Sequence, residues 1–243
     1  MAVKIGHARI DENGNARGGA AGDQNGREIC TTNWYKHEKG WRVFRARDDA
    51  QAAKIAEAMK AACENDRIGY DQNQRNTLYN HASKVNFDTS KVSAACETDC
   101  SALVRVCCAY AGIALPDFNT SSEPRVLLSS GAFVELTGSA YTDKGDQLRA
   151  GDILCTRSKG HTVVVLSDGP NSASVAARPV LRKGAKGSDV RTLQQTLMGY
   201  GYTLAVDGSF GNETLTAVKA FQQKAGLVVD GIVGPKTWAA LEG

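Results

Sequence analysis

The sequence of 243 residues predicts an α+β domain followed by a small all-α domain. Two observations indicate the α+β domain. Residues 100–112 show the helical spacing of apolar side chains, and residues 162–165 form a β-branched run typical of a buried strand. A third observation indicates the all-α domain, because apolar residues recur at helical spacing in three segments after residue 181. The first part of the chain therefore mixes helices with strands, and the second contains helices.

The remaining elements of the first domain follow from local patterns. A run that ends in aromatic residues predicts a strand over 28–35, and an alanine-rich amphipathic segment predicts a helix over 48–65. A second helix is predicted over 71–85, and short strands over 133–136 and 152–155. The strand at 162–165 is followed by a turn-rich segment that ends the domain. We therefore expect this domain to occupy residues 1–170.

The second domain contains an internal repeat. Residues 206–214 (Val-Asp-Gly-Ser-Phe-Gly-Asn-Glu-Thr) recur in outline at 229–237. In each copy Asp-Gly supplies a turn, an apolar residue anchors the loop, and a second glycine leads into a helix. The helices are expected over 188–199, 212–225 and 235–241. A linker is expected over 171–180, and the three-helix domain over 181–243.

One cysteine stands at the start of an apolar helix. The apolar residues that follow Cys100 cover most of this helix until Gly112 ends it. A thiol becomes a nucleophile only as a thiolate, and a helix N-terminus with a nearby imidazole is a common way to produce one. His161, at the mouth of the 162–165 strand, can supply that imidazole. We therefore predict that Cys100 is a nucleophile and His161 its base, with the Cys100 backbone N–H as an oxyanion donor.

The other cysteines show no disulfide or zinc pattern. An odd count of seven without a signal peptide disfavours a disulfide framework, and no Cys-x-x-Cys pair is present. Cys63 and Cys107 fall on apolar helix faces, where packing is their expected role. The glycine-rich segment 18–26 lacks the phosphate-loop motif, which argues against nucleotide binding. We expect neither a metal nor another cofactor.

The composition limits which partners and surroundings we expect for the protein. With 29 basic and 26 acidic residues the net charge is +3, a value that by itself indicates no nucleic acid and suits an anionic cell wall. No stretch approaches the roughly 20 apolar residues of a membrane-spanning helix. Residues 1–14 lack the apolar core of a secretory signal. We expect synthesis in a host cytoplasm, no membrane insertion, and a separate route to the wall; the oligomeric state stays open.

The segment around Cys100 resembles the NlpC family and its CHAP relatives, whose motif runs Asp-Cys-Ser-Gly/Ala-Leu-Val. Residues 99–104 read Asp-Cys-Ser-Ala-Leu-Val, and a family-like Leu-Arg-Ala-Gly-Asp-Ile-Leu segment at 148–154 precedes the histidine strand. The resemblance implies a papain-like cysteine peptidase fold, in which a helix-borne cysteine packs on a small antiparallel sheet. It also implies cleavage of an amide in peptidoglycan.

Two further resemblances support this interpretation. Residues 181–243 closely resemble the three-helix peptidoglycan-binding domain of wall hydrolases. Gly-Asp-Gln at 22–24, followed by Trp-Tyr at 34–35, is similar to N-terminal segments of phage endolysins that carry such a peptidase. The expected partner of the protein is therefore bacterial peptidoglycan.

The residue that orients the imidazole is less apparent. The resemblance implies that the strand after the histidine strand supplies it, but here the domain ends soon after that strand. We therefore expect the N-terminal strand at 28–35 to fill the place, with Asp23 as the third catalytic residue and Glu28 as an alternative. Asp168 is a further alternative, although Asp before Gly-Pro is typical of a turn.

Three residues are candidates for contacts with substrate. Asp99 and Ser101 flank the nucleophile, and Gln24 belongs to the N-terminal segment. Asp99 can equally serve only as the cap of the helix. These assignments follow from position alone.

The leading hypothesis is an endolysin, a bacteriolytic hydrolase of phage type whose cysteine peptidase domain cuts the stem peptide. The NlpC-like motif favours an endopeptidase of the γ-D-glutamyl type. The alternative on the same Cys/His site is an N-acetylmuramoyl-L-alanine amidase. Two further alternatives are a non-catalytic wall-binding protein and an acyltransferase on the same fold, although the latter would leave the second domain unexplained.

Overall fold

The computed structural model describes residues 2–158, 160–172 and 179–242. The chain divides into two compact units, Met1–Ser172 and Ala173–Gly243. The linker expected over 171–180 lies mostly at 173–178, outside the described residues. The first unit mixes a sheet with helices and the second is helical, as the sequence predicts.

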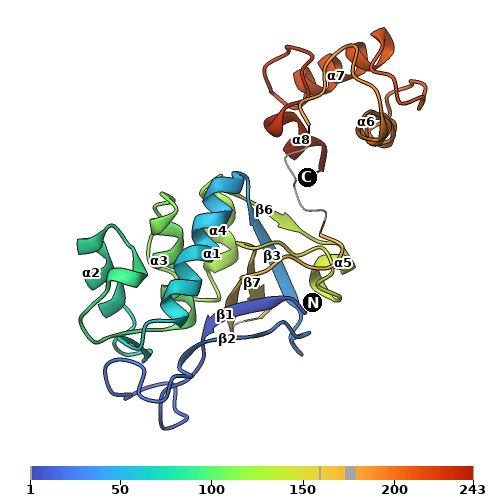
Figure 1. The fold of residues 1–243 in the computed structure, drawn as a ribbon. Coiled ribbons are helices and arrows are strands. Elements are labelled where there is room, and N and C mark those ends of the chain that lie inside the picture. Colours follow the sequence, from blue (N-terminus) through green and yellow to red (C-terminus); the bar gives the residue numbers. More distant parts are fainter. Residues whose placement is uncertain (1, 159, 173–178, 243) are drawn as a thin grey trace. The chain divides into compact units, whose positions relative to one another are not determined.

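An antiparallel sheet of six strands forms the centre of the first unit (Figure 1). The strand order is β2-β1-β8-β7-β3-β6, and every neighbouring pair is antiparallel. The predicted strands at 28–35, 133–136, 152–155 and 162–165 are confirmed, whereas two strands were not predicted. The six strands are β1 (Lys4–Ala8), β2 (Ile29–Asn33), β3 (Trp41–Ala46), β6 (Phe133–Leu136), β7 (Ile153–Thr156) and β8 (Thr162–Val165).

The N-terminal strand β1 lies directly beside the histidine strand β8. Ile5 faces Val165 and Gly6 faces Val164 in this pair, and β2 pairs with the outer side of β1. The prediction that the strand at 28–35 fills this place is therefore wrong, because β2 forms the edge of the sheet. The chain does use its N-terminus to complete the sheet, but with an earlier segment.

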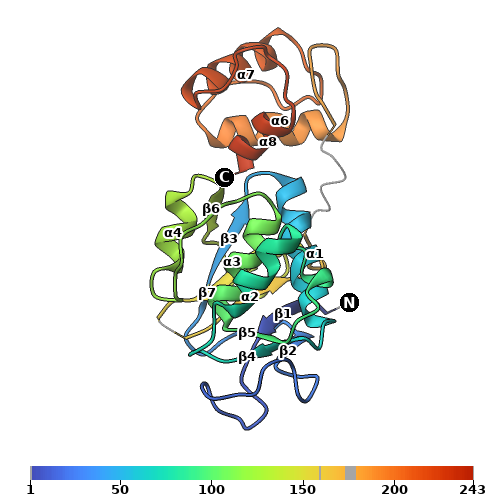
Figure 2. The ribbon, with the colours of Figure 1, turned by 90° about the vertical axis from the view of Figure 1, so that its left-hand side faces the viewer.

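Two helices cover one face of the sheet and build the main core (Figures 1 and 2). They are α1 (Asp49–Cys63), which Asp48 caps by accepting from the Gln51 N–H, and α3 (Cys100–Tyr110). Ile55 and Met59 of α1 and Leu103 of α3 are almost completely buried against the sheet. Burying side chains of this size contributes about 1.5–3 kcal/mol each. The packing fixes the start of α3 relative to the strands.

Smaller elements surround this core. The predicted helix at 71–85 is a shorter α2 (Thr77–Ala82) followed by a 3₁₀ turn, Ser83–Val85; a second 3₁₀ turn is Thr89–Lys91. The remaining elements are β4 (Ile68–Tyr70) and β5 (Cys96–Thr98), which pair in parallel, α4 (Glu123–Ser129) and α5 (Ser139–Thr142).

The opposite face of the sheet is also buried near its centre. A second apolar cluster there includes Trp41, Leu154 and Val163, all fully buried. The turn before β7 packs against α1 so closely that a Cβ at Gly151 would collide with the Ala52 carbonyl, and its φ of +91° suits glycine. The Ala-Gly-Asp sequence at 150–152, just before β7, thus has a packing role.

The second unit contains the three predicted helices. They are α6 (Ser188–Gly199), α7 (Asn212–Lys224) and α8 (Pro235–Glu242). Leu193, Leu197, Val218 and Phe221 are buried in one core with Trp238. Within the described residues of both units, no helix has the length and apolar character needed to cross a membrane.

A buried glutamine holds each Asp-Gly turn of the repeat. Gln194 donates to Asp207 Oδ1 at 2.9 Å and accepts from the Gly208 N–H at 2.8 Å. Gln222 makes the same two contacts with Asp230 and Gly231, both at 2.9 Å. Because each glutamine is only 1% exposed, the repeat is a duplicated structural lock as well as a sequence pattern.

Candidate active site

Cys100 is the first residue of α3. The Asp99 carboxylate caps the helix by accepting from the Ala102 N–H at 2.7 Å. At this first position the backbone N–H of Cys100 has no acceptor within its own helix. The Cys100 side chain is 7% exposed, so the thiol lies just beneath the surface.

Burial opposes ionisation of this thiol. The pKa of Cys100 is raised to about 12, chiefly by burial and then by the nearby Asp99 and Glu123 carboxyls. The backbone N–H groups of Thr162 and Ser101 point to the sulfur and favour the thiolate, but their effect is smaller. Thr162 directly follows His161, so this contact brings the thiol to the start of the histidine strand.

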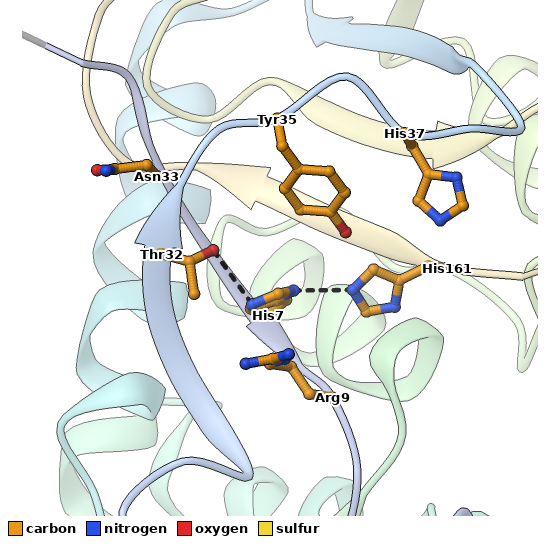
Figure 3. Close-up of a pocket in the computed structure, with 7 residues that line it drawn as sticks. All are labelled: His7, Arg9, Thr32, Asn33, Tyr35, His37 and His161. Atoms are coloured by element: carbon orange, nitrogen blue, oxygen red, sulfur yellow. Dashed lines mark hydrogen bonds between the residues drawn. The ribbon is translucent and has the colours of Figure 1, made fainter.

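The His161 ring is hydrogen-bonded to a second histidine (Figure 3). Its Nε2 lies 2.8 Å from Nδ1 of His7, and His7 Nε2 lies 3.4 Å from the Thr32 hydroxyl. Burial lowers the pKa of His161 to about 4, with smaller effects from the charges of His37 and Arg9. Burial likewise lowers the pKa of His7 to about 3. Both rings are therefore neutral at pH 7.

The resting thiol and imidazole are thus both neutral. Burial therefore works against the thiolate expected from the helix N-terminus and the imidazole, because it penalises the charged form of each group. Among the described contacts, no hydrogen bond joins the Cys100 thiol to the His161 ring, and the link runs through the Thr162 backbone. The Nδ1 atom of His161 remains on the side not used by His7.

His7 is the functional candidate that the sequence did not reveal. It lies in β1, whose residues 3–8 alternate between the two faces of the sheet, with Val3 and Ile5 in the same apolar cluster. This alternation is the signal that could have predicted a strand, although it does not by itself place His7 beside His161.

The residues proposed for the third catalytic position make other contacts. Asp23 accepts from the backbone N–H groups of Glu28 and Ile29 at 3.1 and 3.3 Å, within its own loop. Glu28 is fully buried and accepts from Gln24 N and Tyr70 N at 2.8 and 3.0 Å. These contacts hold the N-terminal loop together, and the hydrogen-bond partner of the imidazole is His7 instead.

Asp168, the last candidate for the third position, and Gln24, a candidate for substrate contact, are also engaged elsewhere. Asp168 accepts from the Ala150 N–H at 2.9 Å and braces the turn before β7. The Gln24 side chain donates to the Ala21 and Gly22 carbonyls.

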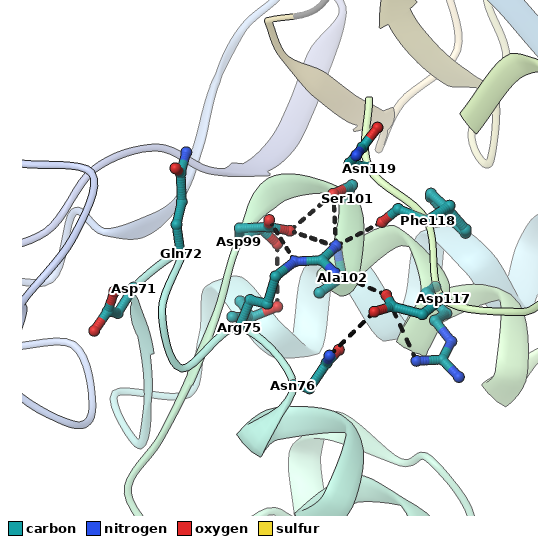
Figure 4. A network of polar contacts seen from close by, with 12 residues as sticks. Asp71, Gln72, Arg75, Asn76, Asp99, Ser101, Ala102, Asp117, Phe118 and Asn119 are labelled. Carbon is teal, nitrogen blue, oxygen red and sulfur yellow. Dashed lines mark hydrogen bonds and ion pairs between the residues drawn. The ribbon is translucent and has the colours of Figure 1, made fainter. Parts of the chain in front are cut away.

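An arginine network holds the two residues that flank the nucleophile (Figure 4). Arg75 donates to Asp99 Oδ2 at 2.6 Å and to the Ser101 hydroxyl at 2.9 Å. The same guanidinium bonds Asp117 at 2.8 Å and the Phe118 carbonyl at 2.6 Å. Asp99 therefore caps α3 and pairs with Arg75 at once. The network ties the start of α3 to Asp117 and Phe118.

A buried carboxyl lies behind the histidine strand. Glu123, the first residue of α4, is fully buried and accepts from the Thr162 hydroxyl at 2.8 Å. Burial raises the pKa of Glu123 to about 8, and the Cys155 thiol is hydrogen-bonded to it. The neutral acid thus anchors the residue that follows His161.

The ring of His161 borders a cavity of about 390 Å³. The side chains around it come from β1 and the residue after it, from β2 and the segment after it, and from the residue just before β8 (Figure 3). No aspartate or glutamate is among the described residues that line it. These residues are His7, Arg9, Thr32, Asn33, Tyr35, His37 and His161.

The other thiols and the acidic groups show no competing arrangement in the described part of the chain. Cys107 and Cys108 are fully buried in α3, and burial raises the pKa of both. Within the described residues, no three His, Cys, Asp or Glu side chains gather as candidate metal ligands.

The first unit is thus an α+β domain with a buried thiol at a helix start and a histidine pair on adjoining strands. The chain belongs to the family described as "Endolysin-like domain", whose model matches residues 5–172. A second model, described as "Putative peptidoglycan binding domain", matches residues 186–241. The second unit is therefore a helical domain of the peptidoglycan-binding type.

Three known proteins share part of this sequence. The N-acetylmuramoyl-L-alanine amidase CwlL of Bacillus licheniformis is 46% identical over 83 residues, 33% of this chain and 23% of the relative. The zinc D-Ala-D-Ala carboxypeptidase of Streptomyces albus G is 48% identical over 61 residues, 24% of each protein. The crystal structure of the Burkholderia AP3 phage endolysin is 48% identical over 27% of this chain and 25% of that one, with a TM-score of 0.27. The chain thus spans about a quarter of the length of these relatives.

Proposed function

We propose that this protein is a peptidoglycan hydrolase that cleaves an amide bond with Cys100 as nucleophile and His161 as general base. The observation that carries the proposal is the contact of the Cys100 sulfur with the backbone N–H of Thr162. Thr162 directly follows His161, whose ring is hydrogen-bonded to His7. Membership of the endolysin-like family supplies the substrate class. A papain-like arrangement is supported by α3 packing on an antiparallel sheet.

Because the Cys100 thiol and the His161 imidazole are both neutral before the reaction, the thiol proton must be transferred during the attack. As Sγ of Cys100 attacks the carbonyl carbon, the thiol proton moves to Nδ1 of His161. To accept it there, the neutral ring must carry its hydrogen on Nε2 and donate it to His7 Nδ1. His7 then carries its own hydrogen on Nε2, where the Thr32 hydroxyl accepts it. This chain of contacts selects the reactive tautomer of His161.

The remaining steps use groups already in place. The Cys100 backbone N–H, free of an intrahelical acceptor, donates to the oxyanion of the tetrahedral intermediate. His161 passes its proton to the leaving amine and a thioester remains on Cys100. A water then attacks the thioester carbonyl while His161 takes its proton. The tetrahedral intermediate collapses, the C–S bond breaks, the carboxylic acid is released, and His161 returns the proton to the Cys100 sulfur. Arg75 keeps Asp99 and Ser101 in position beside the substrate.

The bond is assigned to the stem peptide, with γ-D-glutamyl endopeptidase activity as the first candidate because of the Asp-Cys-Ser-Ala-Leu-Val motif. A second candidate, cleavage between muramic acid and L-alanine, is favoured by the similarity to the CwlL amidase over a third of the chain. The same Cys100 and His161 chemistry serves both. If the protein were instead a non-catalytic wall-binding protein, only the second unit would have a function, namely binding to peptidoglycan.

Each unit has its own role in this proposal. Residues 1–170 catalyse, residues 181–243 hold the enzyme to bacterial peptidoglycan, and 171–180 connect them. The enzyme is made in a host cytoplasm and reaches the wall after release. Neither a metal nor another cofactor takes part in the proposed chemistry.

Purified peptidoglycan provides the test. Wild-type protein should release new amino groups and soluble muropeptides, and their masses name the bond that was cut. Cys100→Ala should abolish release while the protein still sediments with the wall. Cys107→Ala, a buried cysteine of the same helix, is the matched control and should retain activity. Release by Cys100→Ala at the normal rate would refute the proposal.

A further inference from the structure

The cavity beside His161 carries an unbalanced positive charge. Arg9 is exposed and lines this cavity together with three histidines, two of which are kept neutral by burial. No acidic residue belongs to the described lining, and no carboxylate of the described residues forms an ion pair with Arg9. The exposed Arg9 side chain, which is hydrogen-bonded to the Cys30 thiol, therefore lies in a recess of about 390 Å³ without an acidic partner from the described residues.

The charge of Arg9 acts on the groups around it. It lowers the pKa of His7 and of His161, and it works against the burial that raises the pKa of Tyr35. The guanidinium is thus close enough to influence the His161 ring electrostatically. An anion bound at Arg9 would offset this effect and favour the protonated His161 that forms during the reaction.

The cavity lies on the leaving-group side of the proposed reaction. His161 and His7 border it, whereas Cys100 does not. The nitrogen that receives the proton from His161 leaves with the part of the substrate nearest to that ring. We take the chain atoms beyond this nitrogen to enter the recess, whose walls carry Arg9 and Tyr35 on opposite sides (Figure 3).

We propose that Arg9 is a specificity-determining residue that binds a carboxylate of the peptide on the leaving side of the scissile amide. A planar guanidinium presents paired N–H donors that match a carboxylate. Tyr35, which is 39% exposed, offers a hydroxyl on the opposite wall of the same recess. The proposal rests on the proposed function, since it takes the direction of the substrate from the roles of Cys100 and His161.

The test uses two soluble muropeptides that differ only in their leaving-side carboxylates, which are free in one and converted to carboxamides in the other. Wild-type protein, Arg9→Gln and Arg9→Lys are compared in kcat/KM at pH 8, where the catalytic histidines are neutral in each protein. Arg27→Gln is the matched control, because Arg27 is exposed in the N-terminal loop and lies outside the described lining.

Wild-type protein should prefer the free carboxylate by about tenfold, mainly through KM, as expected for a partly solvated charge-assisted hydrogen bond. Arg9→Gln should reduce this preference, taken as the ratio of kcat/KM on the two muropeptides, to less than about twofold. Arg9→Lys should retain part of the preference, and Arg27→Gln all of it. Absence of a preference in the wild type, or an equal loss on both substrates in Arg9→Gln, would overturn the assignment.

A binding measurement separates this site from the hydrolytic activity. In Cys100→Ala protein, the free leaving-side peptide should shift the ring-proton NMR signals of His37 and His161, and the added Arg9→Gln change should remove the shift. If the wild type cleaves neither muropeptide but this Arg9-dependent shift occurs, the proposed function fails and the anion site stands. Inorganic phosphate is titrated in parallel. Tighter Arg9-dependent binding of phosphate than of the peptide would contradict a carboxylate ligand.

Discussion

Replacing His7 tests the tautomer argument most directly. In His7→Ala the Nε2–H of His161 loses the partner that lies 2.8 Å away, in a site where burial already lowers the pKa of both rings. A buried polar group without a partner costs about 1–3 kcal/mol. If the ring recovers its position only at this cost, the rate falls by roughly 5- to 150-fold.

A conservative variant separates this effect from a loss of packing. In His7→Asn the side-chain carbonyl oxygen can accept from His161 close to the place of Nδ1. We expect His7→Asn to stay within about tenfold of the wild type, well above His7→Ala. Thr32→Val removes only a contact of 3.4 Å and should lower the rate by no more than about threefold.

The assay is the release of amino groups from a soluble muropeptide at pH 7.5, with thermal unfolding as the control for the fold. The expected effect lies mainly in kcat, since the hydrogen bond of His7 orients the base. If His7→Ala is folded and as active as the wild type, the role of His7 in selecting the tautomer is refuted. Equal losses in His7→Ala and His7→Asn would also contradict it, because only the alanine lacks an acceptor.

Three further predictions concern pH and the independence of the two units. Burial lowers the pKa of His161 to about 4 and of His7 to about 3, so below about pH 6.5 the unfolded chain binds more protons than the folded one. The stability of the fold should therefore fall as the pH is lowered from 6.5 to 4, while kcat/KM stays level between pH 6 and 8. A value of kcat/KM that falls below pH 6.5 would contradict this. Because the pKa of Glu123 is raised to about 8, the folded protein should lose stability as the pH rises from about 4.5 to 8. Glu123→Gln should reduce the dependence of the unfolding temperature on pH in this range. An unchanged pH dependence would contradict the assignment. A fragment of residues 179–243 should fold alone and pellet with peptidoglycan, and removing it should slow attack on whole wall but not on soluble muropeptides; equal rates on whole wall would show that it does not target the enzyme.

The sequence predicted well those elements whose signals are local. The helix over 100–112 is present as α3 and the β-branched run at 162–165 as β8, because each pattern lies within one continuous segment. The duplicated Asp-Gly turns were likewise visible. The role of Gln194 and Gln222 in holding those turns was not, since each glutamine lies 8 to 14 residues from the groups it binds.

The missed features depend on contacts between distant segments. Strand β1 is short and interrupted by Gly6, and its neighbour β8 lies near the other end of the unit. Nothing in residues 4–8 by themselves predicts that His7 meets His161. The burial of Glu123 has the same origin, since a glutamate next to Pro124 at a helix start is ordinarily exposed. Burial also explains why the thiol is neutral, a property that no local pattern reports.

The contact between β1 and β8 has a consequence for biosynthesis. His7 is synthesised among the first residues of the unit, whereas its partner follows 154 residues later. The site cannot exist on a nascent chain until almost the whole first unit has left the ribosome, and closing so long a loop is a late and slow step of folding. The proposed site is therefore missing during most of the synthesis of the first unit, and any extension or clipping that displaces the first strand removes one half of the histidine pair without touching Cys100.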